Sequence, residues 1–221
     1  SLAAALITLS SWLVEVSLQL VDFFASLPFS SFLVTTPTIP EIVIFYVLVI
    51  AAVSYLNANS GTDAVPEDKA SVKKRLWGAA VIGCLVFFIG DGMFIHLSKK
   101  HSDNLRITFI DVGQGNSALL RLPAGKTMLV DGGGSFNDRF DIGQRVIAPF
   151  LWHEKIGVID VVVLTHPHPD HLNGLIYILE NFDVKEIWTN GETSSSEAWQ
   201  KMISAVSRKG IRHCLLSQKT H

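Results

Sequence analysis

Four side chains that commonly bind metal ions stand within six consecutive positions: His166, His168, Asp170 and His171. Imidazole nitrogens and carboxylate oxygens suit zinc, manganese or iron. In an extended segment, residues two apart point to the same side, so His166 and His168 are expected to converge on one ion. Asp170 and His171 follow directly and can serve a second ion close by. Two such metals would clamp a hydrolytic transition state and supply hydroxide at neutral pH.

An apolar stretch, residues 159–164, leads directly into this cluster and predicts a strand that is buried on both faces. Open α/β folds place their sites at the ends of such strands. Pro167 and Pro169 cannot continue a ladder or a helix, so they are expected to stiffen the loop that carries the histidines. A helix is predicted to begin near Asp170 or His171. A polar loop that is merely rich in histidine is the alternative, and this spacing after a buried strand disfavours it.

The segments around the cluster predict a mixed α/β domain. Three short strands come first, and strands then alternate with helices, which is typical of a sheet with helices on its faces. Gly132, Gly133 and Gly134 are expected to let the backbone pass close to another segment. Strands are predicted at 106–111, 117–122, 126–131, 159–165, 184–189 and 211–216, and helices at 140–152, 171–181 and 196–209.

The pattern His166-x-His168-x-Asp170-His171 resembles the metal-binding signature of the metallo-β-lactamase superfamily. Within that superfamily, residues 109–117 (FIDVGQGNS) and 129–133 (LVDGG) resemble the soluble domain of ComEC-type DNA-internalisation (competence) proteins. The apolar segments that precede them match the layout of that family. The resemblance implies that residues 104–221 form the N-terminal half of a metallo-β-lactamase-like αββα sandwich, truncated at its C-terminus.

The resemblance also implies roles for individual residues. His166 and His168 would bind one divalent ion, zinc or manganese, and Asp170 and His171 a second. Asp170 would in addition orient the attacking water as the catalytic base. Asp131 is expected to hold a ligand or the turn in place, and simple capping of that turn is an equal alternative. Candidates for supporting a ligand or contacting substrate in the neighbouring loop are Asp111, Gln114 and Asn116.

Two features depart from the family pattern. Asn116 stands where the family usually has Asp, and Asn173 stands where it usually has Gly. The later metal ligands of the superfamily normally lie tens of residues further on, and residues 214–221 do not supply them. The sequence is therefore interpreted as a fragment that is inactive by itself, while its full-length parent is the metal-dependent hydrolase.

Composition divides the chain into a membrane part and a globular part. Of the 221 residues, 48% are hydrophobic, and they crowd into the first hundred positions. The net charge of −2 does not indicate a nucleic-acid binder, so DNA contact would require a local patch. Two cysteines, Cys84 and Cys214, form neither a disulfide framework nor a zinc-ribbon spacing.

Residues 1–40 predict an amphipathic, membrane-associated helix followed by a loop. Polar residues recur on this helix at a spacing of three to four, and such a stripe could line a channel, face a partner helix or float at the membrane surface. Those residues are Ser11, Glu15, Gln19 and Asp22.

Residues 41–98 predict two transmembrane helices, at 42–56 and 76–97, joined by the polar loop 57–72. The basic residues that flank this loop slightly favour its placement in the cytoplasm. That orientation would put the later domain on the opposite side of the membrane.

The leading interpretation is a multi-pass protein of the bacterial inner (cytoplasmic) membrane that internalises DNA. Its metal-dependent hydrolase domain would be extracytoplasmic and would cleave phosphodiester bonds of incoming DNA during transformation. DNA and the lipid membrane are the expected partners, with other competence-machinery proteins as further candidates. Two alternatives stay open: a membrane-anchored metallo-hydrolase of another ester or amide, and a DNA-binding module of this fold without catalysis.

Overall fold

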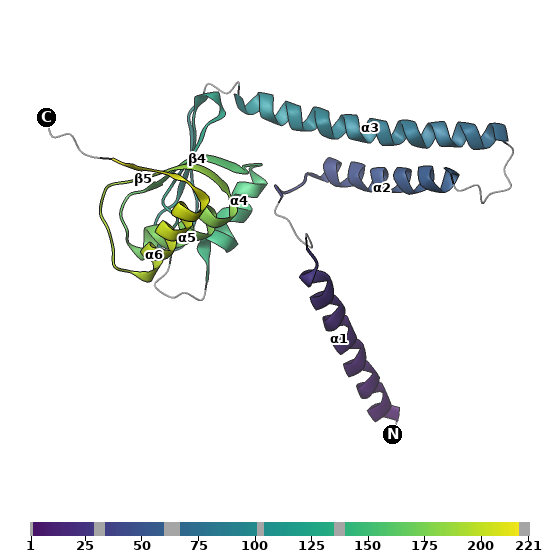
Figure 1. Cartoon of the computed structure of the whole chain (residues 1–221), viewed down its shortest axis with the longest axis horizontal. Helices are drawn as coiled ribbons and strands as arrows, with labels where there is room; N and C mark the ends of the chain where they lie inside the picture. The colour runs from purple at the N-terminus through teal and green to yellow at the C-terminus, as the bar shows by residue number, and fades with distance from the viewer. Residues whose placement is uncertain (1, 29–33, 60–66, 101–103, 135–139, 217–221) are drawn as a thin grey trace. The chain divides into compact units, whose positions relative to one another are not determined.

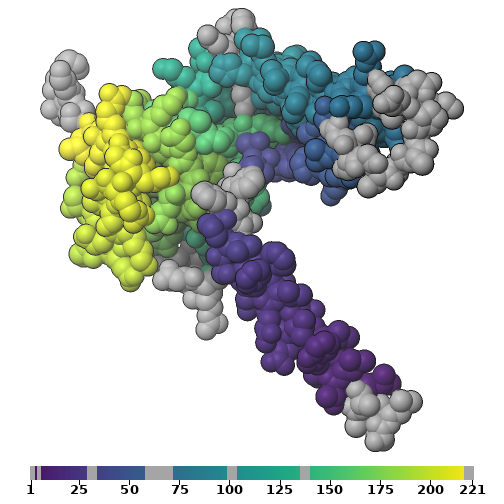
Figure 2. Space-filling view, turned by 45° about the vertical axis from the view of Figure 1, so that its right-hand side comes forward, coloured from purple at the N-terminus to yellow at the C-terminus, as the bar shows by residue number. Residues whose placement is uncertain are grey.

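The computed structural model describes residues 2–28, 34–59, 67–100, 104–134 and 140–216. The chain divides into two compact units, Ser1–Val34 and Thr35–His221. The first unit contains the helix α1 (Leu2–Ser26), whose exposed surface is purple in Figure 2. The second contains two long helices and an α/β domain (Figure 1).

The helices of the second unit that precede the domain are α2 (Ile39–Asn59) and α3 (Glu67–Lys100), which pack against each other. Both extend into the predicted loop 57–72, because glutamate, lysine and alanine at the start of α3 favour helix. Residues 60–66 of that loop lie outside the described residues, as do residues 29–33 of the loop predicted after α1.

Among the described residues, three helices are long and apolar enough to cross a membrane, whereas the sequence predicted two crossing helices and one associated helix. The added candidate is α1, because its polar residues are too few to lower its hydropathy below that of a spanning segment. The three segments are Leu6–Ser26, Ile39–Asn57 and Val72–Ser98.

The described part of the domain contains one six-stranded sheet in the order β1-β2-β3-β4-β5-β6. The first three strands form an antiparallel meander, and the last three are added in parallel, as the alternation of strands and helices predicted. The strands are β1 (Arg106–Phe109), β2 (Ala118–Arg121), β3 (Thr127–Val130), β4 (Val158–Leu164), β5 (Asp183–Thr189) and β6 (Arg212–Leu215).

Helices α5 (Pro169–Asn181) and α6 (Glu197–Lys209) connect the parallel strands and pack against each other. Right-handed crossovers between neighbouring parallel strands place such helices on one face of the sheet. The bounds of α6 follow the sequence: the Ser196 hydroxyl accepts a hydrogen bond from the Trp199 N–H, and Gly210 ends the helix with φ of 65°.

The helix predicted at 140–152 is not a continuous α-helix. Residues Gly143–Ile147 form the π-helical segment η2, and α4 (Ala148–His153) follows. Pro149 near the start of α4 has no N–H, and its ring clashes with a carbonyl four residues earlier, so the preceding turn widens.

The face of the sheet opposite the helices is only partly covered. In β4, Val162 and Leu164 are buried, whereas on the other face Ile159 is buried but Val161 and Val163 are only half-buried. The prediction of burial on both faces is therefore confirmed for one face and only in part for the other. Strand register aligns an apolar row across this open face, in which the Phe109 side chain is 83% exposed. One sheet with helices on one face and an apolar opposite face is the first half of an αββα sandwich. The row comprises Phe109, Ala118, Val130, Val163 and Trp188.

Candidate metal centre

The two histidines after β4 converge through a tight turn. The His168 N–H donates a hydrogen bond to the His166 carbonyl oxygen (2.9 Å), which closes a three-residue turn around Pro167. The fixed φ of proline suits the centre of such a turn. The sequence predicted an extended segment here, and that prediction was wrong. The two imidazole rings nevertheless lie close together. Their centroids lie 4.7 Å apart and their planes are nearly perpendicular (85°).

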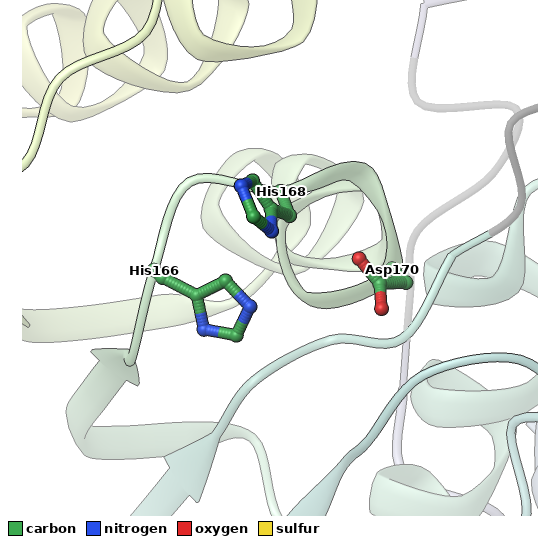
Figure 3. Close-up of side chains that lie close together, drawn as sticks. All are labelled: His166, His168 and Asp170. Carbon is green, nitrogen blue, oxygen red and sulfur yellow. The ribbon is translucent and has the colours of Figure 1, made fainter.

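Asp170 joins these histidines from the first turn of α5. Pro169 is the first residue of that helix, so it starts the helix instead of only stiffening the loop. Proline suits this position because the N–H group that it lacks would have no hydrogen-bond partner within the helix. The positive end of the helix dipole favours the Asp170 carboxylate. One ligand atom from each of His166, His168 and Asp170 lies within 4.8 Å of the others, as Figure 3 illustrates.

His171 is held beside this cluster by Asp131. Its Nδ1 lies 2.7 Å from Asp131 Oδ2, and its Nε2 lies 3.5 Å from Asp170 Oδ2. Its ring centroid is 3.9 Å from that of His166. Because a carboxylate only accepts, we infer that His171 Nδ1 donates its proton to Asp131, and this contact orients Nε2 toward Asp170.

Thr165 is a residue of the site that the sequence analysis missed. Its N–H donates to Asp131 Oδ1 (2.9 Å) and its hydroxyl to Asp131 Oδ2 (2.8 Å). The same hydroxyl oxygen lies 3.0 Å from His166 Nδ1. Asp131 therefore contacts the candidate ligand His171 directly. Through Thr165 at the end of β4, it is also linked to the candidate ligand His166. The only signal in the sequence was that Thr165 directly precedes the first histidine.

Asp131 itself is buried and has a left-handed backbone (φ 58°) directly after β3. The Ser117 hydroxyl donates to its carbonyl oxygen (3.0 Å), and its own N–H donates to the carbonyl of Val163 (2.8 Å). Aspartate tolerates this conformation better than most residues. The strand end is thus fixed by the residue before β2 and by β4, and the Asp131 carboxylate points toward His171.

Glycines allow the segments of the site to approach one another closely. A Cβ atom added at Gly115 would lie 1.8 Å from the Asp170 carbonyl oxygen, and one added at Gly174 would lie 2.0 Å from the Gly132 carbonyl oxygen. The Gly132 N–H donates to the His171 carbonyl (2.7 Å). The expectation that residues 132–134 pass close to another segment is confirmed: they pack against the start of α5.

The loop after β1 reaches the same edge of the sheet. The carbonyl oxygens of Gln114 and Asn116 accept hydrogen bonds from the N–H groups of Gly134 (3.3 Å) and Gly133 (2.9 Å), while their side chains are exposed. Asp111 Oδ1 accepts from the Gly113 N–H (3.2 Å), which is a local turn contact. The structure therefore brings the backbone of this loop to the site, and it places the Asp111 carboxylate in its own turn.

The donor atoms fit a divalent metal. Two imidazoles and a carboxylate within 4.8 Å form a set that borderline-hard ions such as zinc or manganese accept. His171 presents a further nitrogen on the Asp170 side. All four predicted ligands come from one turn and the first residues of one helix, so β4 and α5 together position the centre.

Comparison with known proteins supports a domain of the metallo-β-lactamase type. Residues 110–215 match the family model described as Metallo-beta-lactamase superfamily. The chain is 27% identical over 141 residues to "ComE operon protein 3" of Bacillus subtilis (strain 168), an alignment that covers 59% of this chain and 18% of that protein. The chain thus spans less than a fifth of that relative's length. The family match confirms the resemblance to the metallo-β-lactamase superfamily, and the similarity to this relative confirms the resemblance to ComEC-type proteins.

Proposed function

We propose that this chain is part of a DNA-uptake membrane protein whose metal-dependent hydrolase domain cleaves phosphodiester bonds of incoming DNA. The observation that carries the proposal is the gathering of His166, His168 and Asp170 within 4.8 Å, beside a His171 that Asp131 orients. Similarity to ComE operon protein 3 supports the competence role, and the sequence motifs that resemble DNA-internalisation proteins suggest the substrate.

His166, His168, Asp170 and His171 would hold the ions, zinc or manganese. Bound ions of this kind polarise a phosphoryl oxygen and lower the pKa of bound water. Asp131 keeps the proton on His171 Nδ1 and thereby presents Nε2 to the site. We assign to the Asp170 carboxylate the further role of accepting the proton of the attacking water.

The exposure of the cluster suits a polymeric substrate. His168 is exposed, and His166 and Asp170 are half-buried at the edge of the sheet. A nucleic-acid strand, which cannot enter a closed cavity, can therefore reach all three side chains from solvent. The loop that contains Gln114 and Asn116 lies at the same edge with its side chains exposed, and we propose these two residues as substrate contacts.

The three apolar helices suggest that the chain is associated with a membrane. We propose that it crosses the bacterial cytoplasmic membrane several times. The basic residues near the start of α3 favour a cytoplasmic position for the 57–75 segment, which puts the hydrolase domain outside the cytoplasm. These residues are Lys69, Lys73, Lys74 and Arg75.

The proposal is tested on the purified full-length protein. Single-stranded DNA and a small ester or amide substrate are offered with zinc or manganese, and cleavage is measured for wild type, His168→Ala and Asp170→Ala. His153→Ala, which removes an exposed histidine at the end of α4, is the matched control. DNA cleavage that both cluster variants abolish and the control retains would support the proposal. Cleavage of the small substrate alone, or DNA binding without bound metal, would contradict it.

A further inference from the structure

A cavity of about 360 Å³, lined in part by two arginines, lies at the end of the sheet opposite to the candidate metal centre. Thr127, the first residue of β3, lines the cavity, whereas Asp131 at the metal centre directly follows the last residue of the same strand. The cavity and the metal centre are therefore separated by the length of β3. Other lining residues are Ser98, Arg106, Arg121, Leu122 and Ile156.

Two arginines face each other at this cavity. Arg106 and Arg121 are register partners in the antiparallel pair β1–β2, so their side chains are on the same face of the sheet. Like charges directly opposite each other are destabilising. Glu154 forms an ion pair with Arg121, and Arg106 is exposed without an ion-pair partner among the described residues. An anion bound in the cavity would compensate the second positive charge.

The cavity also lies where α2 and α3 meet the domain. Ser98, the last residue of the candidate span Val72–Ser98, lines it. The start of α2 is attached to the same end of the domain, because Glu41 forms an ion pair with Lys155 (2.7 Å) and the Thr36 N–H donates to the Trp152 carbonyl. A cavity at the ends of two spanning helices is at the level of the lipid headgroups.

We propose that this cavity binds the phosphate of an anionic phospholipid headgroup. The guanidinium of Arg106, which has no ion-pair partner among the described residues, matches a phosphate, and Leu122 and Ile156 add an apolar wall that a headgroup adjoining acyl chains can contact. Ser98, which ends the candidate membrane span in α3, lines the cavity, and this position favours a lipid over a nucleic acid as the source of the phosphate. Binding there would hold the domain with its metal centre facing away from the bilayer.

The inference rests on the proposed insertion of α3 but not on DNA cleavage. It is tested by titrating the detergent-solubilised full chain with short-chain phosphatidylglycerol and following lipid binding by native mass spectrometry. Phosphatidylcholine, inorganic phosphate and a single-stranded oligonucleotide are titrated in parallel. Loss of a hydrogen bond to a charged group predicts that Arg106→Gln weakens phosphatidylglycerol binding about tenfold. Arg106→Lys keeps the positive charge but loses the planar guanidinium group. Its affinity for phosphatidylglycerol should therefore lie between those of wild type and Arg106→Gln.

Lys126→Gln is the matched control, because it removes an exposed positive charge next to the cavity that does not line it. Equal weakening by Arg106→Gln and Lys126→Gln would overturn the proposal in favour of general charge attraction. Equal binding of phosphatidylcholine, displacement of the lipid by inorganic phosphate, or oligonucleotide binding that depends on Arg106 would overturn the lipid assignment. Insertion is checked separately by alkaline extraction of membranes: release of wild type would refute the membrane premise itself.

Discussion

The Nδ1 atom of His171 lies 2.7 Å from Oδ2 of Asp131, and both side chains are buried. This contact joins the residue after β3 to the first turn of α5 and fixes which nitrogen of the imidazole can face a metal. The candidate metal centre thus includes a contact to a carboxylate forty positions earlier in the chain, which the strand pairing β3–β4 brings into place.

Asp131→Asn is predicted to weaken divalent-metal binding about 10- to 100-fold, the usual effect of removing a carboxylate that orients a histidine ligand. Asparagine tolerates the left-handed backbone at this position and can still accept from the Thr165 N–H, so the fold should be retained. Competitive metal titration of the full chain measures the effect. The control is Asp183→Asn, an exposed carboxylate at the start of β5. Equal metal affinity of wild type and Asp131→Asn would contradict this prediction and would indicate that Asp131 only caps its turn.

Gly115→Ala is predicted to destabilise the site by about 1–3 kcal/mol more than Gly113→Ala, because its Cβ would overlap the Asp170 carbonyl oxygen. Both glycines have positive φ (86° and 73°), but a Cβ at Gly113 meets nothing within 4 Å. The pair therefore separates the clash from the backbone strain. Hydrogen exchange of the amides at the start of α5 reports the difference. Indistinguishable exchange in the two variants would show that the loop does not press on α5.

Asp160→Asn is predicted to destabilise the sheet at neutral pH by about 1–2 kcal/mol. Burial alone would raise the pKa of Asp160, but the hydrogen bonds from Lys185 Nζ (2.6 Å) and the Thr127 N–H (2.8 Å) outweigh it and lower that pKa below its usual 3.8. A depressed pKa contributes stability that is present above the unfolded-state pKa and is lost as pH falls through the folded-state value.

The difference between wild type and Asp160→Asn should therefore shrink on acidification below the usual pKa of 3.8. Hydrogen exchange of β3 and β4 amides across this range measures it. Asp183→Asn again serves as the control and should change stability by less than about 0.5 kcal/mol, because its carboxylate is exposed. A difference that stays constant from neutral to acidic pH would refute the linkage.

Much of the domain follows from local signals in the sequence. The apolar run before His166 predicted β4, and Ser196 and Gly210 predicted both ends of α6, because caps and strand periodicity act over a few residues. The candidate ligands were identified for the same reason, since all four stand within six positions.

Features that depend on contacts between distant segments could not be derived in this way. The hydroxyl of Thr165 gains its role only when β3 brings Asp131 beside it. The turn around Pro167 replaces the expected extended segment because the His168 N–H finds the His166 carbonyl. Val161 and Val163 were predicted to be fully buried because they are apolar, but they are half-buried. Apolarity alone does not show which face of the sheet is covered by other elements.

Metal binding by the cluster is the central claim, and calorimetric titration of the purified chain with zinc or manganese tests it most directly. Wild type should bind a divalent ion, and His168→Ala should weaken that binding about tenfold or more, because it removes one donor of the set within 4.8 Å. His153→Ala, an exposed histidine outside the cluster, should bind as wild type does. Absence of binding to wild type, or equal affinity of wild type and His168→Ala, would contradict the account.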